Sequence, residues 1–126
     1  MKYREFHSSG GFVIIAGLDD EGNEAVSFRL AHPADHWFHV HGFPGSHVIL
    51  RCPPDGPEPG RDDLQEAAAV AAWFSKMREG GVVGVSCCRA RDVRKPAGVK
   101  RGTVSIRNER KLKVRPGLPA GEGDDG

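Results

Sequence analysis

The residues that could do chemistry gather in one stretch, from Asp35 to Val48. It holds four of the six histidines, at positions 36, 39, 41 and 47. Side chains two positions apart on a strand point to the same face, so His39 and His41 could bind zinc or copper together. No acidic residue stands at an obvious position for a third ligand. A histidine-ligated metal stays an alternative, and we expect neither a metal nor a cofactor.

The same stretch contains the residue types of a hydrolytic triad in Ser46, His47 and Asp35. Adjacent side chains of an extended segment point to opposite faces, which places Ser46 and His47 poorly for proton exchange. The chain also lacks a G-x-S-x-G motif, a G-x-x-x-x-G-K-[ST] phosphate loop and a G-x-G-x-x-G motif that follows a strand. We therefore predict no catalytic residues and a binding function instead of an enzymatic one.

Basic residues are concentrated in one segment. Residues 89–115 hold eleven Lys or Arg and two acidic residues, a balance of +9, whereas the whole chain has a net charge of +1. Residues 1–88 hold seven basic and twelve acidic residues, a balance of −5. Such a segment on a nearly neutral chain favours contact with a polyanion. A solvated charged hairpin is the alternative.

Two turns could approach a nucleic-acid backbone. A proline and two glycines interrupt the basic segment within 96–102, so its cations lie on a constrained loop that can present side chains and N–H groups to phosphates. The Gly42–Gly45 turn offers a second close approach. His39, His41 or Phe43 could stack on an unpaired base beside it.

Several of these residues also have a structural interpretation. Trp37 and Phe38 are expected to lie in the core, as large aromatic side chains on strands usually do. His39 and His47 could be hydrogen-bonded histidines that hold the turn, and this alternative to RNA contact stays open.

Two hairpins are predicted to position the stretch. Residues 2–7 and 12–16, separated by Ser and Gly, indicate a first β-hairpin. The runs 37–41 and 47–51 indicate a second, antiparallel hairpin around the Gly-Pro-Gly turn. Its alternation separates two faces, with Trp37, His39 and His41 on one and Phe38 and Val40 on the other.

Helical periodicity is clearest over 62–79, which starts at Asp62 or Asp63 as N-cap and ends at Gly80-Gly81. Its many alanines indicate close packing against a sheet. Asn23 could cap a shorter helix over about 23–31, which ends before Pro33. A strand over 25–30 is the alternative.

The C-terminal third adds a strand over 82–88 and a last hairpin that pairs 103–106 with 111–114. The sum is an α+β domain, a mostly antiparallel sheet of hairpins with one long helix packed on it. We expect a single domain over 1–116. The Gly, Pro and acidic composition of 117–126 predicts a disordered tail.

Composition also indicates the compartment. The three cysteines, Cys52, Cys87 and Cys88, have no C-x-x-C spacing, which argues against a disulfide framework and a structural zinc site. The N-terminus is charged, without the apolar run of a signal peptide, and no segment is apolar enough to cross a membrane. We expect a cytoplasmic protein that does not bind membranes.

Three motifs, in order along about 3–115, resemble those of the NFACT-R domain, the RNA-binding module of ribosome quality-control factors. They read Phe6-x-Ser8-Ser9-x-Gly11-Phe12-x-Ile14, Asp35-x-Trp37-Phe38-His39-x-x-Gly42-x-Pro44-Gly45-Ser46-His47-Val48, and Val93-x-Lys95-Pro96-x-Gly98-x-Lys100-x-Gly102. The chain departs from the family at Gly17-Leu18-Asp19-Asp20, where Gly-Arg-Asn-Asn is typical. A basic contact is missing at this edge.

The resemblance implies a module that binds structured RNA, tRNA or rRNA, and that could contact the large ribosomal subunit. The residues expected at the RNA are Arg91, Arg94, Lys95, Lys100, Arg101, His39, His41, Gly42, Phe43, Gly45, Ser46 and His47. Arg94, Lys95, Lys100 and Arg101 would hold phosphates, and the turn with its histidines would supply shape or base contacts. A protein-binding adaptor, whose basic loop meets an acidic surface, is the alternative from another class.

Overall fold

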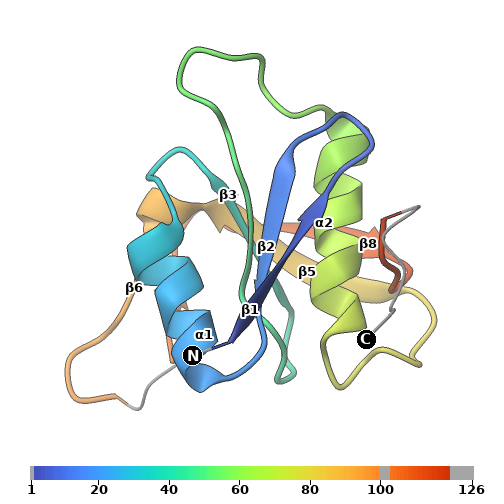
Figure 1. Ribbon diagram of the computed structural model, residues 1–126. Helices are drawn as coiled ribbons and strands as arrows, with labels where there is room; N and C mark the ends of the chain where they lie inside the picture. Colours follow the sequence, from blue (N-terminus) through green and yellow to red (C-terminus); the bar gives the residue numbers. More distant parts are fainter. Residues whose placement is uncertain (1, 100–102, 120–126) are drawn as a thin grey trace.

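A six-stranded antiparallel sheet runs through the middle of the molecule, with a helix on each side (Figure 1). The computed structural model describes residues 2–99 and 103–119. The strands are β1 Tyr3–His7, β2 Val13–Gly17, β3 His36–Val40, β4 Val48–Leu50, β5 Val83–Arg89, β6 Val93–Arg94, β7 Ser105–Ile106 and β8 Arg110–Val114. The helices are α1 Asp20–Ala25, a π-helical turn Val26–Leu30 that continues it, α2 Arg61–Trp73 and a 3₁₀ turn Ala90–Asp92. The predicted α+β class is confirmed.

The strand order is β1-β2-β4-β3-β5-β8, and β6 and β7 form a separate two-stranded ribbon. Both predicted N-terminal hairpins are confirmed. Phe6 of β1 lies opposite Ile14 of β2, and Trp37 of β3 lies opposite Ile49 of β4. β5 then pairs with the other side of β3, so the histidine-bearing strand lies inside the sheet.

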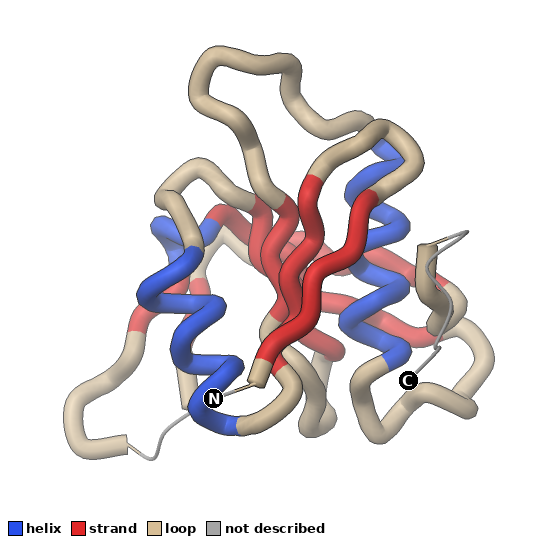
Figure 2. The backbone as a smooth tube through the Cα atoms, in the orientation of Figure 1, coloured by secondary structure: helices blue, strands red, loops and turns tan. Residues whose placement is uncertain are grey.

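The two faces of the sheet bury two separate cores, with α1 and α2 on opposite sides (Figure 2). Phe38 and Val40 pack with the alanines of α2 on one face. Trp37 packs on the other face with Val26 and Val93, which come from the π-helical turn and β6. This division follows from the two-residue period of strands. It confirms the predicted faces of β3 and the core positions of Trp37 and Phe38.

The short helix forms, but its start was predicted wrongly. Asp19, and not Asn23, is the N-cap, and its Oδ1 accepts from the N–H of Gly22 at 2.6 Å. Asn23 Oδ1 instead accepts from the backbone N–H of His47 at 2.9 Å. The acidic departure from the family pattern therefore caps a helix.

The long helix is shorter than the 62–79 predicted, because tertiary pairing ends it at Trp73. Ser75 forms an antiparallel bridge with Gly45 of the β3–β4 turn. The N–H of Ser46 donates to Phe74 O at 3.0 Å, and the N–H of Lys76 donates to Pro44 O at 3.2 Å. At the other end the N-cap is Gly60, whose N–H donates to Asp63 Oδ2 at 2.8 Å.

The predicted hairpin between 103–106 and 111–114 is wrong. Ser105–Ile106 pairs with β6, whereas Arg110–Val114 pairs with β5. Val104 and Ile106 pack in the core beneath β6 and β7, and Leu112 and Val114 pack in the core under α2. The two segments belong to different layers, so they cannot pair with each other.

The last described residues lie against α2. The N–H of Gly117 donates to Ala69 O at 3.2 Å, and Leu118 packs on the core beneath that helix. Residues 120–126 of the predicted tail lie outside the described residues, so the domain boundary at 116 stays a prediction. In the described ranges no helix has the length and apolar character needed to cross a membrane.

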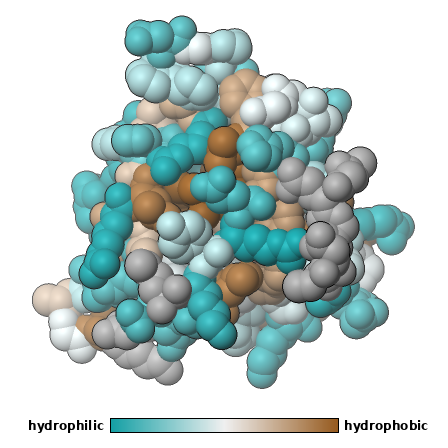
Figure 3. Space-filling view, in the orientation of Figure 1, coloured by the Kyte–Doolittle hydropathy of each residue, from teal (hydrophilic) through white to brown (hydrophobic). Residues whose placement is uncertain are grey.

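Large exposed apolar side chains are spread over separate elements. They are Tyr3, Leu18, Phe28, Phe43 and Val82. On the face seen in Figure 3, apolar areas alternate with hydrophilic side chains. On this face, the described residues therefore favour polar and aromatic groups around a cavity over a broad apolar patch as the place of an interface.

Candidate nucleic-acid interface

Part of one sheet face is left open beside the β3–β4 turn. There His39 of β3, Ser86 of β5 and Lys111 of β8 are successive partners across three strands. Their neighbours along each strand pack under α2, so these three side chains are on the opposite face. A cavity of about 310 Å³ opens here. Its lining comprises Trp37, His39, Val40, His41, Gly42, His47, Ser86, Val104, Ile106 and Glu109.

The floor of the cavity is an aromatic cluster. The His39 ring stacks on Trp37, with centroids 6.1 Å apart and an interplanar angle of 12°. His47 meets both rings edge-on, at 5.3 Å from Trp37 and 5.4 Å from His39. Ser27 Oγ accepts from Trp37 Nε1 at 2.9 Å and lies 2.8 Å from His47 Nδ1. Buried Trp37 and His47 thus hold the half-buried His39 ring in place at the floor.

Burial separates the histidines by role. His47 and Ser46 are buried, and the Ser46 hydroxyl donates to Gly17 O. These contacts fit the interpretation that both residues hold the turn. His39 is half-buried, and burial lowers its pKa, partly offset by hydrogen bonds to the backbone at Val40 and Gly45. A neutral His39 ring suits stacking better than binding of phosphate.

The rim of the cavity carries a hydrogen-bonded trio that the sequence interpretation did not include. Ser86 Oγ donates to Glu109 Oε2, and His41 Nδ1 lies 3.3 Å from the same oxygen. The hydrogen bond from Ser86 is the main reason why the pKa of Glu109 lies below its ordinary value. An ionised carboxylate repels phosphate, so base edges with amino groups suit this part of the cavity better than a backbone does.

The turn itself is held by close backbone packing. Gly42 has φ +81°, a conformation that favours glycine. Phe43 is exposed at the tip. A Cβ on Gly45 would lie 2.8 Å from Ser75 Cβ, so only glycine fits without a shift.

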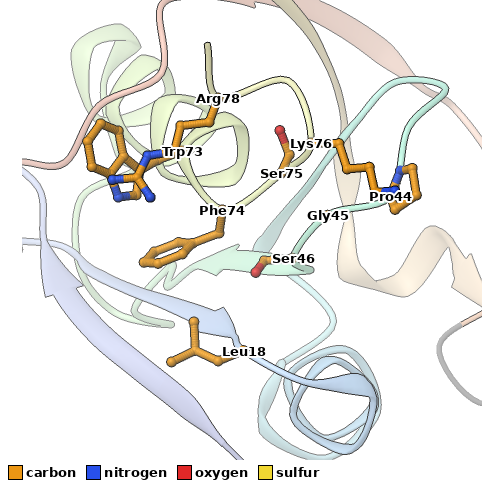
Figure 4. Close-up of a pocket in the computed structure, with 9 residues that line it drawn as sticks. All are labelled: Leu18, Pro44, Gly45, Ser46, Trp73, Phe74, Ser75, Lys76 and Arg78. Carbon is orange, nitrogen blue, oxygen red and sulfur yellow. The ribbon is translucent and has the colours of Figure 1, made fainter.

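On its other side the turn borders a second hollow of about 420 Å³ at the end of α2 (Figure 4). Trp73, Phe74 and Leu18 form its apolar walls, and Lys76 and Arg78 add positive charge. The Arg78 guanidinium lies 3.5 Å from the centre of the Trp73 ring, as in a cation–π contact. The turn thus lies between two hollows, and Lys76 and Arg78 line the hollow at the end of α2.

The predicted phosphate-binding residues lie in different places. Arg94 is exposed and its Nη1 donates to Arg91 O at 2.9 Å. Lys95 Nζ contacts both carboxylate oxygens of Glu24 at 2.8 Å. Lys100 and Arg101 lie outside the described residues. The loop after β6 and the β3–β4 turn lie at the same end of the molecule (Figure 1).

Arg91 accepts the hydrogen bond from Arg94 through its backbone, and the residue belongs to a different cavity. It lines a cavity of about 430 Å³ with Arg89 and Arg110, beside His36 at the other end of β3. Among the predicted RNA contacts, His39, His41, Gly42 and His47 line the 310 Å³ cavity, Gly45 and Ser46 line the 420 Å³ hollow, and Arg91 lines this third cavity.

Sequence reasoning missed the cations of β8. Lys111 and Lys113 are exposed and alternate with the core residues Leu112 and Val114, a pattern that is visible in the sequence. Their pairing with Ser86 and Gly84 was hidden because β8 was predicted to pair with 103–106.

A possible metal cluster lies elsewhere than the His39–His41 pair, which was the alternative metal site considered from the sequence. Ligand atoms of His36, Cys52 and Glu58 lie within 4.8 Å of one another. The Arg89 guanidinium already contacts two of them, at 3.6 Å from Cys52 Sγ and 3.1 Å from Glu58 Oε1. A cation of the protein therefore contacts the ligands that a metal would need.

Asp35, the first residue of the signature, has a structural role. It is fully buried and accepts from Arg51 Nη1 at 3.0 Å, Cys52 N at 2.8 Å and His32 N at 2.9 Å. These bonds fix the entry into β3 and the exit from β4. Asp35 thereby sets the register of the hairpin that carries the turn.

Comparison with known proteins gives consistent relatives. The Rqc2 homolog RqcH of Bacillus subtilis (strain 168) is 35% identical over 111 residues, which cover 88% of this chain and 19% of that protein. The Rqc2 homolog RqcH of Streptococcus suis (strain 05ZYH33) is 34% identical over 113 residues, which cover 90% of this chain and 20% of that protein. The chain therefore spans about a fifth of the length of these relatives.

A solved structure has the same fold. It is the C-terminal part of the fibronectin/fibrinogen-binding protein from Streptococcus suis, with a TM-score of 0.85 and 32% sequence identity over 93% of this chain and 47% of that chain. Residues 2–108 match the family described as the NFACT protein RNA binding domain. Since this match covers most of the chain, the chain belongs to the NFACT family of RNA-binding domains.

Proposed function

We propose that the chain is a non-catalytic module that binds structured RNA, tRNA or rRNA, in ribosome quality control. The observation that carries the proposal is the open sheet face, where an aromatic floor, hydrogen-bonding side chains and lysines meet within an RNA-binding family. The RqcH relatives support the ribosomal context. The proposal includes the large subunit as a partner. The proposal places the chain in the cytoplasm.

In this proposal the bases and the phosphates of the RNA contact different side chains of the protein. An unpaired base stacks on His39 or Phe43, and His41 contacts a base edge. In the proposal, phosphates are held by Arg94, Lys95, Lys100 and Arg101 of the loop and by Lys111 of β8. Lys95 exchanges its ion pair with Glu24 for a phosphate, which costs little because both groups are partly exposed. Gly42, Gly45, Ser46 and His47 position the turn.

The test is the salt dependence of binding to bulk tRNA. Each phosphate contact adds about 0.7–0.9 to the slope of log affinity against log salt. We expect a steep slope between about 50 and 200 mM salt, as counterion release requires. Lys111→Ala should reduce that slope by about one contact.

Arg61→Ala is the matched control, because Arg61 is an exposed cation at the start of α2, outside the residues that line the 310 Å³ cavity. It should leave the slope unchanged. A flat salt dependence for the unaltered protein, or equal losses in both variants, would reject the proposed interface.

A further inference from the structure

The strongest site outside the open sheet face is the 430 Å³ cavity at the opposite end of β3. Its wall is predominantly polar and contains three guanidinium groups. The side chains that matter are those of His36, Arg89, Arg91, Asp92, Asn108 and Arg110. Three arginines around one cavity form the fork-shaped donor set that suits phosphate.

Existing contacts leave a positive excess in this cavity. Glu58 pairs with Arg89 at 3.1 Å, and the side chain of Glu58 is mostly exposed. Asp92 accepts from Asn108 Nδ2 at 3.2 Å. Burial, together with the positive charges of Arg89 and Arg110, lowers the pKa of His36 to about 4, although Glu58 and Asp35 oppose this. Near neutral pH His36 is therefore an uncharged hydrogen-bonding group, and the arginines supply the charge.

The backbone around the cavity is fixed in place. The N–H of Ala90 donates to Asp35 O at 2.8 Å, and the N–H of Arg91 donates to Pro33 O at 3.1 Å. The N–H of Arg107 donates to Asp92 O at 3.1 Å, and Asn108 has φ 54° in the left-handed region. A backbone held in this way binds a ligand at little cost in backbone conformational entropy, so that the main entropic cost is the ordering of the arginine side chains.

The arginine-lined cavity lies next to the cavity over the open sheet face, and this closeness indicates which ligand it binds. Glu109 lines the cavity over the open sheet face, whereas its neighbours Asn108 and Arg110 line this one. One turn, residues 107–109, thus separates the two cavities. An RNA strand that lies on the open sheet face and continues past this turn would bring its following phosphate to the three arginines.

We propose that the Arg89–Arg91–Arg110 pocket binds an internal phosphate of the RNA strand that crosses the open sheet face. The proposal rests on the proposed function, but the pocket can also be tested without RNA. Arg89 is unsuitable for mutation because its Nη1 donates to Ala34 O at 2.6 Å and holds the loop before β3. Arg91 and Arg110 are exposed and can be replaced.

The first experiment compares Arg91→Ala/Arg110→Ala with Arg61→Ala in binding to bulk tRNA. The double variant should lower the salt slope by about 0.7–0.9, the contribution of one phosphate, while the control keeps the slope of the unaltered protein. Circular dichroism checks that both variants are folded. A double variant that behaves like the control overturns the proposal.

The second experiment titrates the unaltered protein with inorganic phosphate at constant ionic strength, with chloride as the control anion, and follows amide NMR signals. Phosphate should shift the Asn108 side-chain amide and the backbone amides of 90–92, and the double variant should abolish these shifts. If tRNA does not bind but these shifts occur, the proposed function fails and the phosphate pocket stands. If the shifts are absent, the pocket is rejected even when tRNA binds.

Removal of the 5′-terminal phosphate of tRNA with phosphatase distinguishes the two sources of phosphate. Unchanged affinity supports an internal phosphate. A loss of affinity in the unaltered protein but not in the double variant overturns that assignment in favour of the chain end.

Discussion

At the residue scale, the histidines between positions 36 and 47 have four different environments. His36 is buried beside Arg89, His39 stacks on Trp37, His41 is exposed near Glu109, and His47 is hydrogen-bonded to Ser27. His39, His41 and His47 line one cavity, whereas His36 lines another at the opposite end of β3. Their strand positions and burial decide which can meet a ligand.

His36 should make stability depend on pH. Its pKa in the folded protein, about 4, lies below the ordinary value of 6.5. Between these values the unfolded chain binds a proton that the folded chain does not, so this contribution is present above about pH 6.5 and is lost as the pH falls towards 4. We expect urea-unfolding free energies to fall over this range, and to fall less steeply in His36→Asn.

The quantity to compare is the slope of unfolding free energy against pH, because His36→Asn can also change stability by the same amount at every pH. The carboxylates titrate in both proteins, so the difference between the slopes reports His36. Equal slopes would show that burial does not hold this imidazole neutral.

At the element scale, the important junction joins the β3–β4 turn to the end of α2. Backbone hydrogen bonds from Ser46 to Phe74 and from Lys76 to Pro44 both end the helix and hold the turn. The helix is shortened relative to its sequence periodicity because these bonds compete with another helical turn. The turn gains the rigidity that a binding surface needs.

Gly45→Ala should disturb this junction. Its Cβ would lie 2.8 Å from Ser75 Cβ and 3.3 Å from Ser75 Cα, so the turn and α2 must separate. We expect a loss of about 1–3 kcal/mol of unfolding free energy, as for other overpacked sites. Urea denaturation measures this change.

Gly84→Ala is the matched control, because a Cβ at this strand position would meet no atom within 4 Å. It should leave stability unchanged or raise it by up to about 1 kcal/mol, since alanine is less flexible than glycine in the unfolded chain. Equal losses in both variants would argue against close packing at Gly45.

At the scale of the whole molecule, one sheet separates two cores and leaves part of one face open. α2 covers one side, while α1, the π-helical turn and the β6–β7 ribbon cover a portion of the other. The uncovered portion is the proposed RNA surface. The charge asymmetry of the sequence acquires a location only through this arrangement, because β8 carries its lysines to the open face.

The end of the domain can be tested through Leu118, which packs against the core beneath α2. Leu118→Ala should lower the unfolding free energy by about 1 kcal/mol, the value for a partly buried leucine. Leu18→Ala, at an exposed leucine, should change it by less than about 0.5 kcal/mol. If thermal and urea unfolding show no difference between the two variants, the folded unit ends before Leu118, near the predicted boundary.

Much of the fold could be predicted from local pattern. The two-residue alternation predicted both N-terminal hairpins and the opposite faces of Trp37 and Phe38. The helical periodicity and the many alanines of 62–79 predicted a helix packed on a sheet. Part of the candidate site, the turn with His39 and His41 on one face, was visible for the same reason. Side-chain direction in a strand depends only on the strand itself.

The rest depended on contacts between distant segments. Periodicity cannot say which of two cores a strand joins, so the pairing of β8 with β5, and with it the place of Lys111, came only from tertiary structure. Nor can it show that Gly45 pairs with Ser75 and ends α2 early. By itself the sequence determined the elements and the charge-bearing segment. Only the tertiary structure decided that Ser46 and His47 are buried and that Arg91 lines one cavity with Arg89 and Arg110. Burial and strand pairing depend on contacts between segments that are far apart in the sequence.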